Sequence, residues 1–313
     1  MTTVPVPQER RTVFITGCSD GGLGSGLALE FHKRGLRVLA SARNLDKMST
    51  LKEAGIETVP LDVLDPTSIS DCVNTVSSLT SSKLDILINN AGGGYNMSIT
   101  DISLPSAKQL FDLNVWSYIS VIQAFLPLLL HSRSSHSSSR CPTTTDSNSS
   151  TPMIVNNTSI SSVNLTPFNS VYHASKAALA SFTSHLRLEL SPFNIYVVDL
   201  KTGSVRSNFH SNRSDPTRIP SHSLYLPIRK EVEDTMNGTL YLPTAMPVEQ
   251  WAADVVDDLL RKDPPPVNVW RGRQAGRTWW EWCFAPTVTW LDRRLKEGTG
   301  LARLERILKG EGK

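Results

Sequence analysis

Cysteine is scarce in this chain of 313 residues, and the four present, Cys18, Cys72, Cys141 and Cys283, are far apart with no CxxC pair. This spacing argues against a disulfide framework and against a cysteine zinc site, so we expect a reducing compartment and no metal. The residues before the first apolar run, MTTVPVPQERR, hold no hydrophobic segment of a secretory signal. The sequence therefore predicts a cytoplasmic location.

An excess of one charge sign is also lacking. The 32 lysines and arginines nearly balance the 29 aspartates and glutamates, and no basic block is long enough to indicate nucleic-acid binding. Hydrophobic residues make up 39%, charged residues 19%, and the mean hydropathy is −0.18, which excludes both a disordered polar chain and a membrane bundle. A folded protein whose partners are small molecules remains.

No internal repeat is visible, and strand-like runs alternate with helix-like runs instead. The strand-like runs are Val13–Thr16, Arg37–Ala42, Thr58–Leu61, Leu84–Asn89, Met153–Asn157 and Ile195–Leu200. The helix-like runs are Gly24–Arg34, Leu45–Ala54, Thr67–Leu79, Leu104–Leu130, Ala174–Leu190 and Pro247–Arg261. Such alternation predicts an α/β fold of the Rossmann type, a doubly wound parallel sheet between two layers of helices.

We expect one domain over residues 1–262, interrupted by two irregular segments. Residues 131–152 are rich in serine and threonine with almost nothing apolar to bury, which predicts a flexible surface insertion. Residues 206–247 predict a substrate lid, because long loops at the carboxyl edge of such a sheet are usually functional. Residues 263–313 form a C-terminal extension that holds five of the seven tryptophans.

A glycine-rich segment, TGCSDGGLG, lies where the first strand ends and the first helix begins. Glycines at such a turn let the backbone approach a pyrophosphate, and the N-terminus of the helix supplies N–H donors. An ordinary glycine-rich turn is the alternative, and the position directly after a strand makes it the weaker one. The predicted cofactor residues here are Gly17, Ser19, Gly21, Gly22, Leu23 and Gly24.

The end of the second strand indicates which dinucleotide is bound. No carboxylate is present there to take the ribose hydroxyls of NAD, and Arg43 offers a guanidinium for a 2′-phosphate. NADP(H) is therefore the predicted cofactor. An ordinary surface arginine is the alternative, and the charge of Asp20 in the glycine loop would oppose that phosphate.

A tyrosine and a lysine four residues apart, Tyr172 and Lys176, share one face of a predicted helix. A neighbouring ammonium stabilises a phenolate, so we expect Lys176 to lower the pKa of Tyr172 towards neutrality. Ser159 precedes the tyrosine by 13 residues, Asn114 lies in the long helix, and Asn89-Asn90-Ala91-Gly92 closes the fourth strand.

Together these motifs resemble those of the short-chain dehydrogenase/reductase family, in its single-domain branch. The matching segments, in the family's order, are TGCSDGGLG, Asp62 in LDV, NNAG at 89–92, Asn114 in LNV, Ser159, YHASK, and Thr202-Gly203-Ser204-Val205. Within the family the chain is similar to fungal NADPH-dependent 1-acyl-dihydroxyacetone-phosphate reductases. The glycine loop is one residue longer than the family's usual loop, so either Gly21 or Gly22 makes the tight turn.

The resemblance implies the role of each site residue. Tyr172 would donate the proton, Lys176 would lower its pKa and bind the nicotinamide ribose, Ser159 would polarise the carbonyl, and Asn114 would hold a proton-relay water. Asp62 would take the adenine amino group and the backbone of Val205 the carboxamide. The other implied cofactor residues are Val63, Asn90, Ala91, Gly92, Gly203 and Ser207.

The implied activity is the NADPH-dependent reduction of a ketone to a secondary alcohol on a hydrophobic substrate, with 1-acyl-dihydroxyacetone phosphate as one candidate. A tailoring ketoreductase of fungal secondary metabolism is the alternative enzyme, and a non-catalytic dinucleotide-binding sensor is the alternative from another class. The predicted lid contains five cations, Arg206, Arg213, Arg218, Arg229 and Lys230. They would either bind a phosphate of the substrate or be solvated surface charges.

The tail leaves three alternatives open. Its Trp279, Trp280, Trp282 and Trp290 stand among arginines, a composition that suits the headgroup zone of a bilayer. The same rings would also suit the substrate pocket or a second subunit. The bilayer alternative implies peripheral attachment to the endoplasmic reticulum or to a lipid-droplet surface. The second-subunit alternative implies assembly into a homo-oligomer.

Overall fold

The computed structural model describes residues 10–137, 151–208, 217–239, 242–261, 263–284, 296 and 298–310. Within these ranges seven strands form one parallel sheet in the order β3-β2-β1-β4-β5-β6-β7. The strands are β1 (Thr12–Thr16), β2 (Arg37–Ala42), β3 (Glu57–Pro60), β4 (Ile86–Asn89), β5 (Met153–Asn157), β6 (Tyr196–Thr202) and β7 (Asn268–Arg271). The strand order reverses between β1 and β4, the position at which such sheets bind ligands.

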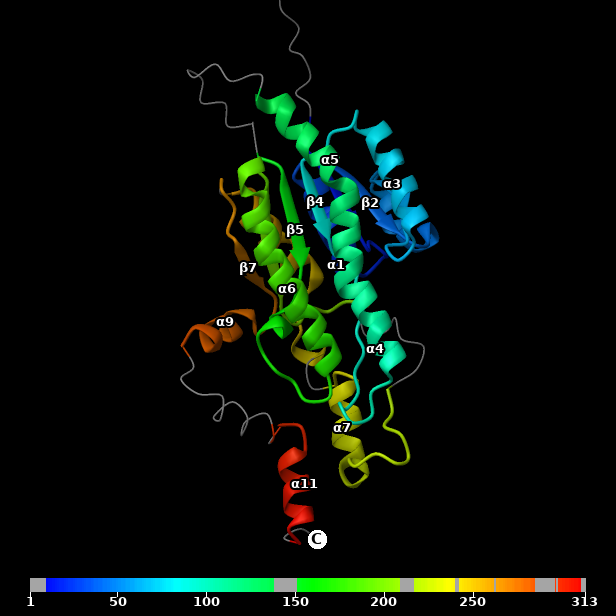
Figure 1. Ribbon diagram of the computed structural model, residues 1–313, viewed down its shortest axis with the longest axis vertical. Helices are drawn as coiled ribbons and strands as arrows, with labels where there is room; N and C mark the ends of the chain where they lie inside the picture. The colour runs from blue at the N-terminus through cyan, green and yellow to red at the C-terminus, as the bar shows by residue number, and fades with distance from the viewer. Residues whose placement is uncertain are drawn as a thin grey trace, which may run out of the picture.

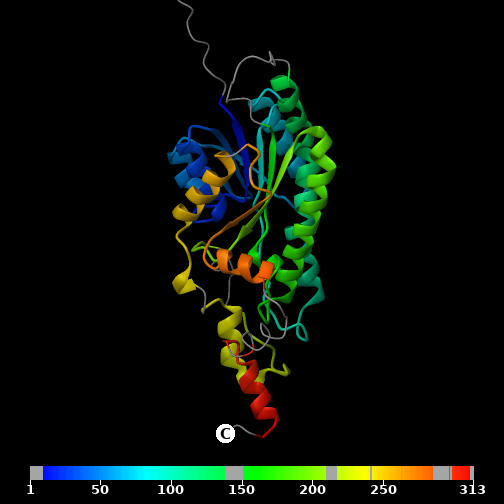
Figure 2. The same cartoon turned by 90° about the vertical axis from the view of Figure 1, so that its left-hand side faces the viewer.

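Helices cover both faces of the sheet, which confirms the predicted three-layer fold (Figures 1 and 2). One face carries α1 (Leu23–Lys33), α2 (Ser49–Glu53) and α8 (Val248–Leu260). The other carries α3 (Pro66–Leu79), α5 (Ser117–Ser137) and α6 (Ser170–Leu190), with α4 (Leu104–Phe111) leading into α5. The remaining described α-helices are α7 (Arg229–Met236), α9 (Ala275–Phe284) and α11 (Leu301–Leu308).

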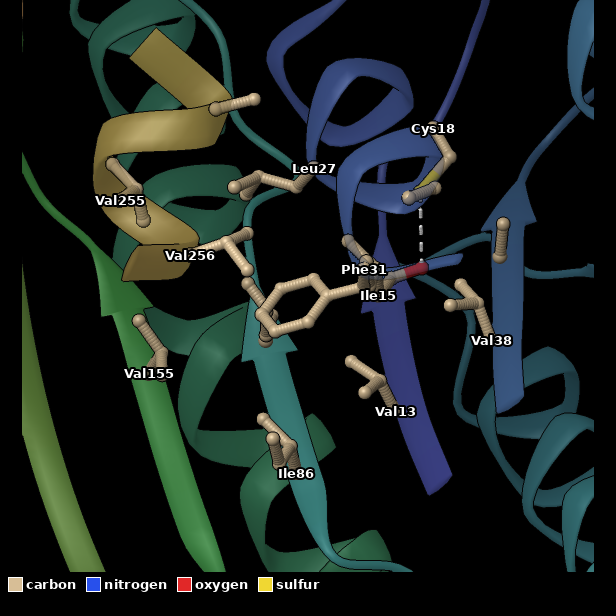
Figure 3. Close-up of a cluster of buried hydrophobic side chains, with 14 of the residues drawn as sticks. Val13, Ile15, Cys18, Leu27, Phe31, Val38, Ile86, Val155, Val255 and Val256 are labelled. Carbon is tan, nitrogen blue, oxygen red and sulfur yellow. Dashed lines mark hydrogen bonds between the residues drawn. The ribbon is translucent and has the colours of Figure 1, made fainter. Parts of the chain in front are cut away.

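Each face of the sheet has its own apolar core. Figure 3 shows the first, which includes Phe31 of α1, Val256 of α8 and Ile15 of β1. In the second, the rings of Phe14 and Phe125 stack with centroids 4.5 Å apart. Alternate residues of a strand point to opposite faces of the sheet, and here helices cover both faces. Residues on both faces are therefore apolar, and the strands are near-continuous apolar runs.

The stretch Leu104–Ser132 is long and apolar enough to cross a membrane by composition. Within this stretch, Val121, Phe125 and Leu129 of α5 are buried against the sheet, so that α5 contributes to the protein core.

The structure corrects the start of the predicted insertion 131–152. Helix α5 runs to Ser137, and the buried Ser132 hydroxyl donates to Asp85 Oδ1 at 2.6 Å. The other oxygen of Asp85 accepts from the Thr12 N–H at 2.7 Å. A buried carboxylate needs such donors, so Ser132 belongs to the folded domain. Residues 138–150 lie outside the described residues.

Two more boundaries differ from the prediction. The lid segment 206–247, expected to be irregular, contains helix α7, whose Val232 and Met236 are buried with Ile228 and Leu304 in a third apolar cluster. The strand β7 lies within residues 263–313, so the sheet extends past residue 262. Both elements are short and gain their stability from tertiary packing, which local pattern does not reveal.

Replacing Phe125 by alanine should lower the free energy of unfolding by about 3–5 kcal/mol, because the ring is fully buried and its loss leaves a cavity against Phe14. Equilibrium denaturation measures this change. Phe193→Ala is the matched control, since that ring is 47% exposed, and it should cost under about 1 kcal/mol. Equal losses would show that the second core is not packed as described.

Candidate active site

A cavity of about 400 Å³ lies at the carboxyl ends of the strands. Its wall runs from the glycine loop and Arg43, past Lys176 and Tyr172, to Asn164 and Asn169. In Figure 1 this is the end of the sheet that faces α7. The cavity thus joins the two regions that the sequence marks separately, the glycine loop and the Tyr-Lys pair.

The glycine loop has the geometry that close approach of a pyrophosphate requires. Gly21 makes the tight turn with φ +71°, a conformation that side chains disfavour, while Gly22 caps α1 in extended conformation. A Cβ on Gly24 would come within 2.5 Å of the Gly17 carbonyl oxygen. No side chain caps the first turn of α1, so its N–H groups remain available for an anion. These residues fit a dinucleotide.

A row of side-chain hydrogen bonds joins the ends of four strands, and the sequence analysis missed most of it. The Thr16 hydroxyl accepts from the Asn90 N–H at 2.9 Å, and Asn90 Oδ1 accepts from Asn157 Nδ2 at 2.9 Å. Thr202 Oγ1 then donates to Asn157 Oδ1 at 2.6 Å. Polar residues directly after apolar strands, as in Asn156-Asn157, were the available signal.

The adenosine end of the cavity carries an exposed cation. Arg43 lines it and forms no ion pair with any residue in the described ranges. The Asp20 carboxylate is turned towards α2, where it accepts from the Ser49 hydroxyl at 2.9 Å. The expected repulsion between Asp20 and a 2′-phosphate is therefore weaker, because the carboxylate interacts with the start of another helix.

Tyr172 and Ser159 are brought together, although they come from α6 and from the segment after β5. A side-chain hydrogen bond joins them, and Ser159 Oγ also donates to the Thr202 carbonyl at 3.3 Å. Burial raises the pKa of Tyr172 above its ordinary value, and the bond with Ser159 only partly opposes this. The expectation that Lys176 lowers this pKa is wrong for the structure, because loss of hydration is the largest effect.

Lys176 is buried, and its Nζ donates to the Asn157 carbonyl at 2.9 Å. The same nitrogen lies 6.0 Å from the centre of the Tyr172 ring and 5.5 Å from that of Tyr118. Burial lowers the pKa of Lys176 to about 8, with partial compensation from the carboxylate of Asp199. With this pKa the ammonium form of Lys176 still predominates at neutral pH.

Asn114 lies in a π-helical turn, Asp112–Trp116, between α4 and α5. Its Oδ1 accepts from the Gly93 N–H at 2.9 Å, and its Nδ2 donates to the Gly93 carbonyl and to Ser175 Oγ, both at 3.0 Å. Three of the four hydrogen bonds that the amide can make thus tie the loop after β4 to α6. The structure shows this positioning role, and the proton-relay water stays a prediction.

Most of the predicted cofactor residues line the cavity. They are Gly17, Ser19, Gly22, Leu23, Arg43, Asp62, Val63, Asn90, Ala91, Gly92, Tyr172, Lys176, Gly203, Val205 and Ser207. Gly21, Gly24, Asn114 and Ser159 are not part of its described wall.

The start of the lid closes onto the glycine loop. The Asn208 N–H donates to the Gly21 carbonyl at 3.0 Å, and Asn208 Nδ2 donates to the Asp20 carbonyl at 2.9 Å. Of the lid cations, Arg206, Arg218, Arg229 and Lys230 are exposed, and Arg213 lies outside the described residues.

The tryptophans of α9 do not line the cavity in the described part of the chain. Trp279, Trp280 and Trp282 are 44%, 56% and 60% exposed, and the ring of Trp282 lies 6.1 Å from that of Trp270. Trp290 lies outside the described residues. Contact of the tail with a membrane surface or with a second subunit stays a prediction.

The chain is similar to known proteins in both sequence and fold. The sequence model of the short chain dehydrogenase family matches residues 11–217. A short-chain dehydrogenase/reductase of Pestalotiopsis microspora is 43% identical over 85% of this chain and 86% of its own. An NADPH-dependent 1-acyldihydroxyacetone phosphate reductase of Schizosaccharomyces pombe is 34% identical over 86% of this chain and 89% of its own. The fold matches that of a Burkholderia cenocepacia short chain dehydrogenase in complex with NADP, with a TM-score of 0.66, 21% identity, and coverage of 92% and 98%.

Replacing Tyr172 by phenylalanine should lower the turnover of a ketone by about 10²–10⁴-fold, because it removes the hydroxyl that can donate a proton and little else. Dinucleotide binding, measured by fluorescence titration, should change little. Tyr196→Phe is the control, since that ring lies at the amino end of β6, away from the cavity. Turnover of the Tyr172 variant within about threefold of the parent would contradict the assignment.

Proposed function

Because the chain belongs to the short-chain dehydrogenase/reductase family, we propose that it reduces a ketone to a secondary alcohol at the expense of NADPH. One observation carries the proposal: Tyr172, bonded to Ser159 and next to Lys176, faces the cavity that also reaches the glycine loop and Arg43. A group that can donate a proton thus lines the same cavity as the residues that would hold a dinucleotide. The family assignment makes the protein an oxidoreductase.

The bound dinucleotide would supply a hydride to the carbonyl carbon, and the chain supplies the rest. Charge then develops on the carbonyl oxygen, to which the Tyr172 hydroxyl, bonded to Ser159, would donate. The Tyr172 proton passes to that oxygen and the alcohol leaves neutral. Lys176, which is fixed by the Asn157 carbonyl, would hold the nicotinamide ribose.

NADPH is the proposed dinucleotide rather than NADH. The support is the exposed guanidinium of Arg43 at the adenosine end, the absence of a carboxylate at the end of β2, and the Asp20 side chain turned towards α2. The relative from Schizosaccharomyces pombe is NADPH-dependent by name, which is consistent with this choice.

A neutral ketone is the substrate class that we favour, as in a tailoring reductase of fungal secondary metabolism. Beyond Tyr172 the described wall of the cavity is made of neutral groups, among them Asn96, Asn164, Asn169 and Thr235. Its only cations in the described ranges are Arg43 and Lys176, which the dinucleotide would use. A phosphate buried there would lack a counter-charge.

The second candidate substrate is 1-acyl-dihydroxyacetone phosphate, favoured by the relative from Schizosaccharomyces pombe. For this substrate, the cations of the lid would have to move over the cavity. Arg206 is the nearest to it in sequence, between the lining residues Val205 and Ser207, but its side chain is exposed.

Replacing Arg43 by aspartate should shift preference from NADPH to NADH, because the change removes the partner of the 2′-phosphate and supplies an acceptor for the ribose hydroxyls. Loss of a charge-assisted bond of about 1.5–3 kcal/mol corresponds to roughly a 10- to 150-fold weaker binding of NADPH. Dissociation constants for both dinucleotides measure it. Lys52→Asp, an exposed cation of α2, is the charge-matched control. An unchanged ratio would contradict the role of Arg43.

A matched pair of substrates separates the two candidates. We expect acyl-dihydroxyacetone and its phosphate ester to be reduced with kcat/KM values within about threefold of each other, since the described cavity offers no partner to the phosphate. NADPH consumption measures both. A tenfold or greater advantage of the phosphate ester would establish the second candidate instead. Failure of the chain to oxidise NADPH with any ketone of a broad panel would favour the sensor.

A further inference from the structure

A buried ion pair lies behind the site, outside the described wall of the cavity. Lys201 Nζ donates to Asp199 Oδ2 at 2.7 Å, and each of the two side chains is only 6% exposed. Both residues belong to β6, and because they are two positions apart their side chains point to the same face of the sheet. The ring of Trp270 in β7 has its centre 5.5 Å from the lysine nitrogen. The proposed reaction has so far given this pair no role.

Stability alone does not account for the pair. Two charges lose their hydration on burial, and their mutual attraction often does no more than offset this cost. Apolar residues of similar volume would stabilise the sheet about as well. Val197, on the same face of β6, is apolar and buried in the second core. The reason for the pair is therefore to be found in the other bonds that Asp199 and Lys201 make.

These other bonds lie on both sides of Ser159. Asp199 Oδ1 accepts from the hydroxyl of Thr158, the residue directly before Ser159. Lys201 Nζ donates to Ser162 Oγ at 3.1 Å, and the Ser162 hydroxyl donates to the Ser159 carbonyl at 2.7 Å. The segment 158–162 is thus attached at both of its ends to one buried pair.

The side chain of Ser159 depends on this attachment because it has competing partners. Its Oγ accepts from the Ser161 N–H at 3.1 Å and donates to the Thr202 carbonyl at 3.3 Å, and it also bonds with Tyr172. A shift of the segment would favour one partner over another. Misplacing a reacting group by about 1 Å can lower a rate about 100-fold. The bond to Tyr172 therefore requires that the backbone of Ser159 be held in place.

We propose that Lys201 and Asp199 are positioning residues for the proton transfer, and that they hold the segment 158–162 so that the Ser159 hydroxyl stays bonded to Tyr172. The proposal rests on the proposed ketone reduction. Neither residue of the pair touches the substrate or the dinucleotide; both act through Ser159. Ser162 connects Lys201 to Ser159 and can be replaced without changing any charge, which makes it the most direct position for a test.

Replacing Ser162 by alanine should lower kcat for ketone reduction by about tenfold, because the Ser159 carbonyl loses its connection to Lys201. The dissociation constant for NADPH and the melting temperature should change little. Ser162→Thr keeps a hydroxyl and should restore most of kcat. Ser191→Ala is the matched control, because its exposed hydroxyl also donates to the carbonyl three residues earlier, at 2.8 Å, and this variant should keep the parental kcat.

The pH profile of Ser162→Ala supplies a readout that a merely structural role would not move. The bond with Ser159 lowers the pKa of Tyr172, and oxidation of an alcohol needs the phenolate. Loss of this bond should therefore shift the rise of kcat/KM for alcohol oxidation to higher pH, by about half a unit or more. The other titratable groups around the Tyr-Lys pair, all unchanged in this variant, are Lys176, His173, Tyr118, Asp199 and Lys201.

The double variant Asp199→Leu/Lys201→Met removes both charges at similar volume. The buried Thr158 hydroxyl keeps an acceptor in the Leu200 carbonyl at 3.3 Å. We expect a melting temperature within about 5 °C of the parent and a kcat lower by about tenfold or more. A folded double variant with the parental kcat would overturn the proposal. If the double variant does not fold, the two Ser162 variants decide the question.

The outcomes separate the positioning pair from the reaction. A parent that reduces ketones, together with a Ser162→Ala variant of unchanged kcat and pH profile, contradicts the pair and leaves the ketone reduction intact. A parent that reduces no ketone contradicts the proposed function instead. Crystal structures of the parent and of Ser162→Ala then test the pair. A bond between Ser159 and Tyr172 that is present in the parent and lost in the variant supports the pair, and an unchanged bond overturns it.

Discussion

The site depends above all on the hydrogen bonds that join the ends of neighbouring strands. At the carboxyl edge of a parallel sheet the backbone leaves its ladder, and its polar groups lose their partners unless side chains replace them. Asn90 and Asn157 do this: the first bonds to Thr16 and the Gly17 carbonyl, the second to Thr202, and the two bond to each other. Changing one partner would leave the next one buried and unpaired, so the edge behaves as a unit.

Lys176, one of the side chains proposed for catalysis, is attached to this edge as well as to its own helix. Lys176 and Tyr118 both donate to the main-chain carbonyl of Asn157, at 2.9 and 3.3 Å, from helices on the same face of the sheet. Asn114 connects the loop after β4 to α6 through Gly93 and Ser175. The π-helical turn that contains Asn114 costs helix geometry, and such turns are frequent at functional sites for this reason.

The sequence predicted the fold and most of the cavity wall because both follow from local pattern. Strands β2 and β5 have the expected bounds, since buried parallel strands are unbroken apolar runs. Helix α7, strand β7 and the bond from Ser132 to Asp85 were missed because only distant packing stabilises them. The role of Asn157 was missed for the same reason: its partners come from β4, β6 and two helices.

The pKa of Tyr172 shows why pattern alone misjudged the electrostatics. A Tyr-Lys pair in water would share a stabilised phenolate, but here the same burial raises the pKa of the phenol and lowers that of Lys176 to about 8. Loss of hydration penalises both charged forms, so the neutral phenol is the resting state at neutral pH. A phenol that keeps its proton is the form that donates to a developing alkoxide, whereas oxidation of an alcohol needs the phenolate. The resting protonation state of the pair thus follows from its burial, which outweighs the proximity of the two side chains.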